Sequence, residues 1–209
     1  AVGRDRFDAF LKGWFERHKS QPVTSAIFLA DLRQHLVKGD QAPEQKLMLD
    51  QWVYQPGIPA NMMKPDPQAF AGVDRAVITL AGGAAPDAGA WSRWNTDERL
   101  RFLNTLPRTQ AKAQLDALNN AFGLNGTRNM EVRFAWLELA VANRYDPALP
   151  SLEEFLLGNG RGKFVKPLIK ALAADAGWGR PIAVRIYAKS RALYHPLVTR
   201  ELDELKLGQ

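Results

Sequence analysis

The sequence contains no cysteine. This absence excludes a disulfide framework, a thiolate zinc site and a cysteine nucleophile. The sequence also lacks a run of 18 consecutive apolar residues, so no transmembrane helix and no membrane partner are expected. The missing cysteines do not decide the compartment, because cysteine-free proteins occur both in the cytosol and in the periplasm.

The signatures of common hydrolase active sites are missing as well. The chain has three histidines, His18, His35 and His195, and no two of them have the i, i+4 spacing of the HExxH zinc motif. GxSxG is absent, and the glycine-rich residues 158–163 follow a predicted helix and lack the Ser or Thr that completes a phosphate-binding loop. By its own residues, the chain is predicted to hold neither a catalytic centre nor a metal.

Large apolar side chains are plentiful. Of the 209 residues 46% are apolar, and they include 6 Trp and 10 Phe. This length suits one large domain, or one domain with a piece of another, and such a chain buries roughly 70% of its unfolded surface. The N-terminus shows neither a starting Met nor an apolar signal core. We therefore expect a globular chain that begins inside a longer protein.

Helical periodicity runs through most of the chain. Residues 7–15 place apolar side chains at i, i+3, i+4, i+7 and i+8, and later segments repeat this stripe. Residues 129–143 are apolar on more than one side, which is typical of a central, buried helix. No alternating strand of convincing length occurs. About ten helices with short links predict an all-α fold of antiparallel helix pairs, either a solenoid or a compact bundle.

A proline-rich segment interrupts the helical pattern. Residues 54–67 contain four prolines, which remove backbone donors and restrict their neighbours. We therefore expect an extended connection and a domain boundary here, after a short apolar turn at 47–52.

Several polar residues and prolines suggest where helices begin. Asp66-Pro67 has the order of a cap followed by a first helical residue. Ser151 and Glu154 have the spacing of a capping box. Pro167 and Pro181 are each expected in a first helical turn, where the missing N–H costs nothing.

The positive charge is concentrated near the C-terminus. The net charge is +6, and residues 161–200 hold nine Lys or Arg against one acid, Asp175. Such an excess can attract nucleic acid or a small anion. It can equally be the solvated face of a helical array.

Four segments, in the same order, resemble a known enzyme family. They are WVYQPGIP at 52–59, NMEVRFAWL at 129–137, GRGKFVKPL at 160–168 and YHPL at 194–197. They resemble the W-x-Y-x-P-G-x-P connector, the N-x-E-[IV]-R-F-x-W-L helix, the G-R-x-K-F-x-[RK]-P-L segment and a C-terminal segment of the leukotriene A4 hydrolase and aminopeptidase family. The resemblance covers essentially the whole chain.

The resemblance implies an anatomy. Residues 1–52 would be the last helices of a thermolysin-like catalytic domain, 53–66 the connector, and 67–209 an armadillo-like α–α superhelix. The HExxH zinc ligands and catalytic residues of the family would lie upstream of this chain. In the family, the Arg and Lys of G-R-x-K bind the free carboxylate of short peptides. These are Arg161 and Lys163 here, separated by Gly162 where the family often has a larger residue.

Two functions follow. The first is the substrate-anchoring and scaffold domain of a zinc aminopeptidase, whose partners are its own catalytic domain and short peptides. The alternative is a non-catalytic helical-repeat module that binds protein or nucleic acid through its basic C-terminal third. The first is preferred, so nucleic acid is not the expected partner and a cytoplasmic location is favoured over a periplasmic one. The isolated chain should bind no stoichiometric zinc, cleave no aminoacyl substrate and self-associate through its first 50 or so residues.

Overall fold

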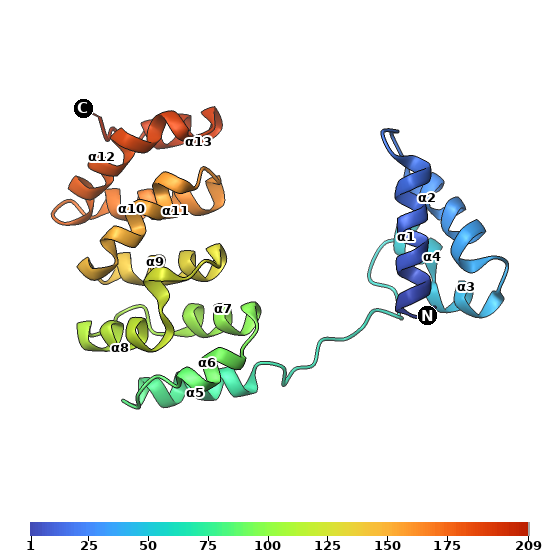
Figure 1. Cartoon of the computed structure of the whole chain (residues 1–209), viewed down its shortest axis with the longest axis horizontal. Coiled ribbons are helices and arrows are strands. Elements are labelled where there is room, and N and C mark those ends of the chain that lie inside the picture. Colours follow the sequence, from blue (N-terminus) through green and yellow to red (C-terminus); the bar gives the residue numbers. More distant parts are fainter. Residues whose placement is uncertain (209) are drawn as a thin grey trace. The chain divides into compact units, whose positions relative to one another are not determined.

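The computed structural model describes residues 1–208 (Figure 1). The chain divides into two compact units, Ala1–Asp66 and the residues from Pro67 onward. No strand occurs among the described residues, so the predicted all-α class is confirmed. None of the helices in this part of the chain is long and apolar enough to cross a membrane.

The first unit is a small helical assembly. Its elements are α1 (Arg4–His18), α2 (Ser25–Leu32), a π-helical turn (Arg33–Val37), α3 (Gln41–Leu47) and α4 (Leu49–Tyr54). Thr24 caps α2 by accepting a hydrogen bond from the Ile27 N–H. The predicted apolar turn at 47–52 is wrong, because helices α3 and α4 meet there at Met48, which has a left-handed backbone. The core is small and consists of Phe10, Trp14, Leu32, Leu36 and Val37.

A buried carboxylate lies beside this core. Asp31 is 7% exposed and receives two hydrogen bonds from Arg17, of 2.6 and 2.8 Å. The side chain of His18 lies 3.1 Å from Asp31, and that of His35 lies 3.8 Å away. The hydrogen bond from Arg17 is the main reason that the pKa of Asp31 is lowered. The pair therefore fastens the end of α1 to α2.

The second unit is an ordered stack of helices. They are α5 (Ala71–Ala81), α6 (Ala88–Arg93), α7 (Thr96–Thr105), α8 (Lys112–Phe122), α9 (Met130–Ala142), α10 (Leu149–Gly158), α11 (Gly162–Ala174), α12 (Gly179–Ser190) and α13 (Pro196–Asp203). Short 3-10 turns lie at Leu124–Gly126, Asp146–Ala148 and Arg191–Leu193. In Figure 1 these helices follow one another as successive tiers from α5 to α13.

The packing alternates along the stack. Helix α5 packs on α7, α7 on α9, α9 on α11 and α11 on α13, while α6 packs on α8 and α10 on α12. The odd-numbered helices therefore form one continuous layer, and the even-numbered helices pack on one another in the pairs α6–α8 and α10–α12. This arrangement is typical of an α–α superhelix. The superhelix expected from the family resemblance is thus confirmed, and a compact bundle is not formed.

Helix α9 is the centre of this stack, as its apolar pattern predicts. Trp136, Leu137 and Leu139 are fully buried. The indole N–H of Trp136 donates a 2.7 Å hydrogen bond to Asn125. This bond satisfies the one polar atom of a buried tryptophan and ties α9 to the turn before it.

Three predicted helix starts are displaced. Residues 67–70 form a turn, and α5 begins at Ala71, so Asp66 and Pro67 do not start it. Pro167 lies inside α11, because that helix starts five residues earlier at Gly162. Ser151 lies inside α10, because Pro150 already occupies its first turn.

Gly179 allows an unusually close helix crossing. A Cβ atom there would lie 2.4 Å from the Leu172 carbonyl oxygen of α11. The first turn of α12 therefore rests directly on the backbone of α11, as only glycine permits. Pro181 follows in this first turn, as predicted.

Candidate functional site

The candidate site lies at the N-terminus of α11. Arg161 is the N-cap residue of this helix, and Lys163 is its second residue. Their side chains are 64% and 51% exposed. The structure therefore brings both predicted site residues together at the start of one helix, where they are accessible to solvent.

The first turn of α9 supplies a carboxylate to these two cations. Lys163 Nζ donates a 2.6 Å hydrogen bond to Glu131 Oε2. Arg161 Nη1 lies 3.7 Å from Glu131 Oε1, which is an ion pair but longer than a hydrogen bond. The Asn129 side chain caps α9 by accepting from the N–H groups of Glu131 and Val132, at 3.1 and 3.2 Å.

A buried aromatic ring forms the floor of the site. Both the Arg161 guanidinium and the Lys163 ammonium lie 5.3 Å from the centre of the Phe164 ring. Phe164 is 3% exposed and packs against Phe134 and Phe155, with ring centres 5.2 and 5.6 Å apart. The negative face of the ring attracts both cations, so they are held over a fixed surface.

A second arginine secures the helices around the floor. Arg133 is 7% exposed and donates hydrogen bonds to Ser151 Oγ, at 2.9 Å, and to the Ser151 carbonyl, at 3.0 Å. It also pairs with Glu154. The predicted capping box of Ser151 and Glu154 is therefore wrong. Both residues instead satisfy the buried Arg133 and fasten α10 to α9.

The local electrostatics favour an anion. The positive end of a helix dipole disfavours Lys and Arg and attracts negative charge. The first turn of α11 nevertheless carries Lys163 and no acid. Glu131 offsets one of the two side-chain charges, which leaves the three groups with one net positive charge. The arrangement can hold one carboxylate.

Part of the C-terminal positive charge is offset by acids across the stack. Seven of the nine basic residues in 161–200 pair with acids outside that segment: Arg161 and Lys163 with Glu131, Lys166 and Lys170 with Glu201, Arg185 and Lys189 with Glu153, and Arg191 with Asp203. Arg180 donates instead to the carbonyls of Leu205 and Lys206. These seven cations share four acids, so ion pairing offsets four of the nine positive charges and leaves the segment basic.

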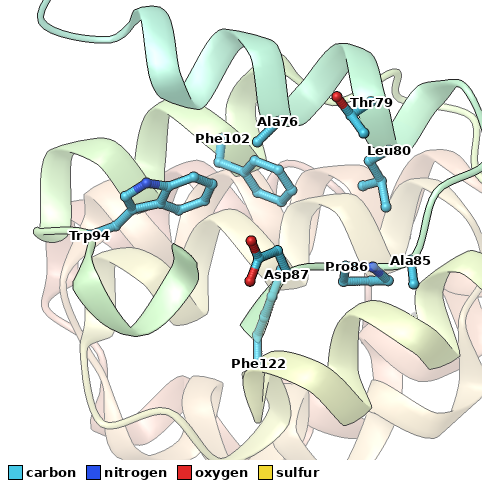
Figure 2. A pocket seen from close by; sticks show the side chains of 9 residues that line it. All are labelled: Ala76, Thr79, Leu80, Ala85, Pro86, Asp87, Trp94, Phe102 and Phe122. Atoms are coloured by element: carbon cyan, nitrogen blue, oxygen red, sulfur yellow. The ribbon is translucent and has the colours of Figure 1, made fainter. Parts of the chain in front are cut away.

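A small pocket lies elsewhere, between α5, α7 and the loop before α6. Its volume is about 170 Å³, and Figure 2 shows the rings of Trp94, Phe102 and Phe122 around it with the Asp87 carboxylate. Asp87 already accepts a 2.9 Å hydrogen bond from the Ala90 N–H as the cap of α6. Asp87 is the one charged residue of the lining, so the pocket is a weaker candidate.

The histidines do not gather into a metal site. His18 and His35 face Asp31, which Arg17 already engages, and His195 caps α13 by accepting from the Leu197 N–H. In residues 1–208, no group of three or more His, Cys, Asp or Glu side chains is placed to hold a metal ion.

The sequence predicts the two cations but not Glu131 and Phe164, which the structure places beside them. Both lie in motifs that carry the family resemblance, but their roles depend on the packing of α9 against α11. The sequence did contain one signal for Glu131. Arg161 and Lys163 lie at the start of a helix that has no acid in its first turn, so a carboxylate from another helix is expected to offset their charge.

Comparison with known proteins gives concordant matches. Residues 94–205 match the family model described as "Leukotriene A4 hydrolase, C-terminal". Leucine aminopeptidase 2 of Pyricularia oryzae is 27% identical over 99% of this chain and 34% of its own length. Leucine aminopeptidase 2 of Chaetomium globosum is 26% identical with the same coverage. The chain thus spans about a third of each relative.

Solved structures show the same fold. Native yeast LTA4 hydrolase matches 97% of this chain and 36% of its own chain, with a TM-score of 0.62 and 21% identity. The yeast LTA4 hydrolase complex with bestatin matches 97% of this chain and 36% of its own, with a TM-score of 0.60 and 18% identity.

Proposed function

The chain belongs to the leukotriene A4 hydrolase C-terminal family, and from this membership we infer that it is the substrate-anchoring and scaffold part of a zinc aminopeptidase. Such an enzyme would remove N-terminal residues from short peptides. Arg161 and Lys163 would hold the free carboxylate at the far end of the peptide. The relatives' name, leucine aminopeptidase 2, supports the activity of the intact protein.

One observation carries this proposal: two exposed cations share the Phe164 floor at the start of α11, and Glu131 offsets one charge of the two. A guanidinium presents a planar pair of donors that fits a carboxylate, and an ammonium adds a point charge. Fixing the far end of a short peptide would place its first peptide bond at a constant distance from the anchor.

The zinc of the intact enzyme would be held outside this chain. The sequence has no HExxH, and residues 1–208 form no metal-binding group of three or more His, Cys, Asp or Glu. The residues present therefore do not fit the metal, and no catalytic step is assigned to them. The role proposed for this chain is to bind and orient the substrate and to support the catalytic domain.

The alternative, a helical-repeat module for protein or nucleic acid, rests on the basic C-terminal third. Four acids, shared by seven of its nine cations, offset part of the positive charge that would attract nucleic acid. The buried aromatic residues of the stack also offer no stacking surface for bases.

The test is Arg161→Ala in the intact enzyme, with kcat/KM measured on a tripeptide and on its C-terminally amidated twin. If Arg161 binds the carboxylate, the acid should lose about 2–4 kcal/mol of transition-state stabilisation and the amide much less. Arg185→Ala is a matched control, since Arg185 is 52% exposed and pairs with Glu153. Equal, small losses on both substrates would reject the anchoring role.

A further inference from the structure

We propose that Glu131 determines the specificity of the Arg161–Lys163 site. By cancelling one of the two positive charges, it makes the site select a single carboxylate over a dianion. This inference rests on the proposed function, in which the site binds the end of a peptide.

Glu131 lies closer to Lys163 than to Arg161. It accepts a 2.6 Å hydrogen bond from Lys163, so the ammonium is already engaged by a carboxylate. Its distance of 3.7 Å from Arg161 Nη1 leaves the donors of the guanidinium unused by Glu131. Arg161 is therefore the group that offers a bidentate contact, and one carboxylate fills it.

Helix α9 keeps this negative charge in place. Glu131 lies in the first turn of α9, where the helix dipole stabilises an acid, and the Asn129 cap orders that turn. Helices α9 and α11 pack together, and the charged groups of both cations lie 5.3 Å from the centre of the buried Phe164 ring. A second negative group on the ligand would thus meet Glu131 as well as the cations, and like charges repel.

A comparable cluster elsewhere in the stack provides a control. Glu153 of α10 accepts a 2.6 Å hydrogen bond from Lys189 and a 3.4 Å one from Arg185, both in α12. This cluster has the same charges as the candidate site, one carboxylate beside one arginine and one lysine. It lacks the helix N-terminus of the candidate site, because Arg185 and Lys189 lie in the interior and last turn of α12.

The experiment compares two tripeptides in the intact enzyme at low salt, one ending in Ala and the other in Asp, which adds a second carboxylate at the same end. Glu131→Gln keeps an acceptor for Lys163 and removes the charge. It should raise kcat/KM for the Asp peptide, relative to the Ala peptide, by about fivefold, the effect of one unit charge about 4 Å away in water. Glu131→Asp, which keeps the charge, should leave the ratio unchanged, and so should Glu153→Gln.

Two results would overturn the inference. One is an unchanged Asp-to-Ala ratio in Glu131→Gln, and the other is an equal rise in Glu153→Gln. If Arg161→Ala still distinguishes acid from amide in either case, the anchoring role survives and only the part given to Glu131 is lost. If Arg161→Ala does not distinguish them, the proposed function itself fails.

Discussion

The two units of the chain differ sharply in how much apolar surface they leave exposed. Ten of the fifteen exposed large apolar side chains lie in residues 1–66, which is less than a third of the chain. The core of this first unit has five buried residues, whereas the stacked helices of the second unit share one continuous core. A surface of this kind normally marks an interface. The second unit thus buries its own apolar residues, while we propose that the catalytic domain of the intact protein covers the first.

Disrupting the helix packing of the second unit should have the largest effect on stability. Gly179→Ala would place a methyl group 2.4 Å from the Leu172 carbonyl and force α12 away from α11. We expect a loss of about 3 kcal/mol or more in the free energy of unfolding, because this neighbour is backbone and cannot turn aside. Hydrogen exchange followed by mass spectrometry would locate the loss in α11 and α12.

The control for this substitution is Gly72→Ala in α5, where a Cβ meets nothing within 4 Å. A helix prefers alanine, so this change should be neutral or slightly stabilising. A Gly179→Ala protein as stable as Gly72→Ala would show that the close crossing does not limit the packing of the stack.

Removing the Arg17–Asp31 ion pair of the first unit should have a smaller effect on stability. Arg17→Ala leaves the Asp31 carboxylate without its two strongest hydrogen bonds and should cost about 2 kcal/mol. Arg4→Ala, which removes an exposed ion pair with Asp8, should cost about 0.5 kcal/mol or less. Hydrogen exchange should report the first loss in residues 1–66 only, and equal effects of the two variants would contradict the role of Asp31.

The Arg17–Asp31 pair should also make the stability of the first unit depend on pH. Because the pKa of Asp31 is lowered in the folded state, its contribution is complete above the unfolded value of about 4 and declines as the pH falls through the folded value. Asp31→Asn should therefore flatten the stability of the first unit against pH in the acid range. A profile identical to that of the original chain would exclude Asp31 as the titrating group.

The smallest effect concerns association. The isolated chain should self-associate through the exposed apolar surface of its first 50 or so residues, which includes Phe15 at 67% and Val23 at 48% exposure. Replacing both residues by Ser should lower the weight-average mass in sedimentation equilibrium. Leu193→Ser, at a 61% exposed position of the second unit, is the control. A monodisperse monomer at all concentrations would contradict this prediction.

Sequence periodicity predicted the helices well wherever one face is buried. The stripes of α1 and α5 and the broadly apolar segment of α9 each supply buried residues to the two cores. Periodicity did not predict α4, which has no buried residue. It also did not predict the short helix α6, whose one buried residue is Trp91. Helix starts were also poorly predicted. Ser151 shows why. The local sequence around a serine that caps a helix is the same as that around a serine whose hydroxyl accepts a hydrogen bond from a buried arginine of another helix.

The sequence alone therefore determined the all-helical class, the proline-rich break and the identity of the two cations at the candidate site, because periodicity, proline geometry and short motifs are local properties. Only the tertiary structure decided which charges are neutralised. The partners of the basic C-terminal residues include Glu131 and Glu153, which lie 30 to 36 residues away along the chain. Coulomb energy depends on distance in space, and the superhelix, by placing every second helix side by side, sets that distance.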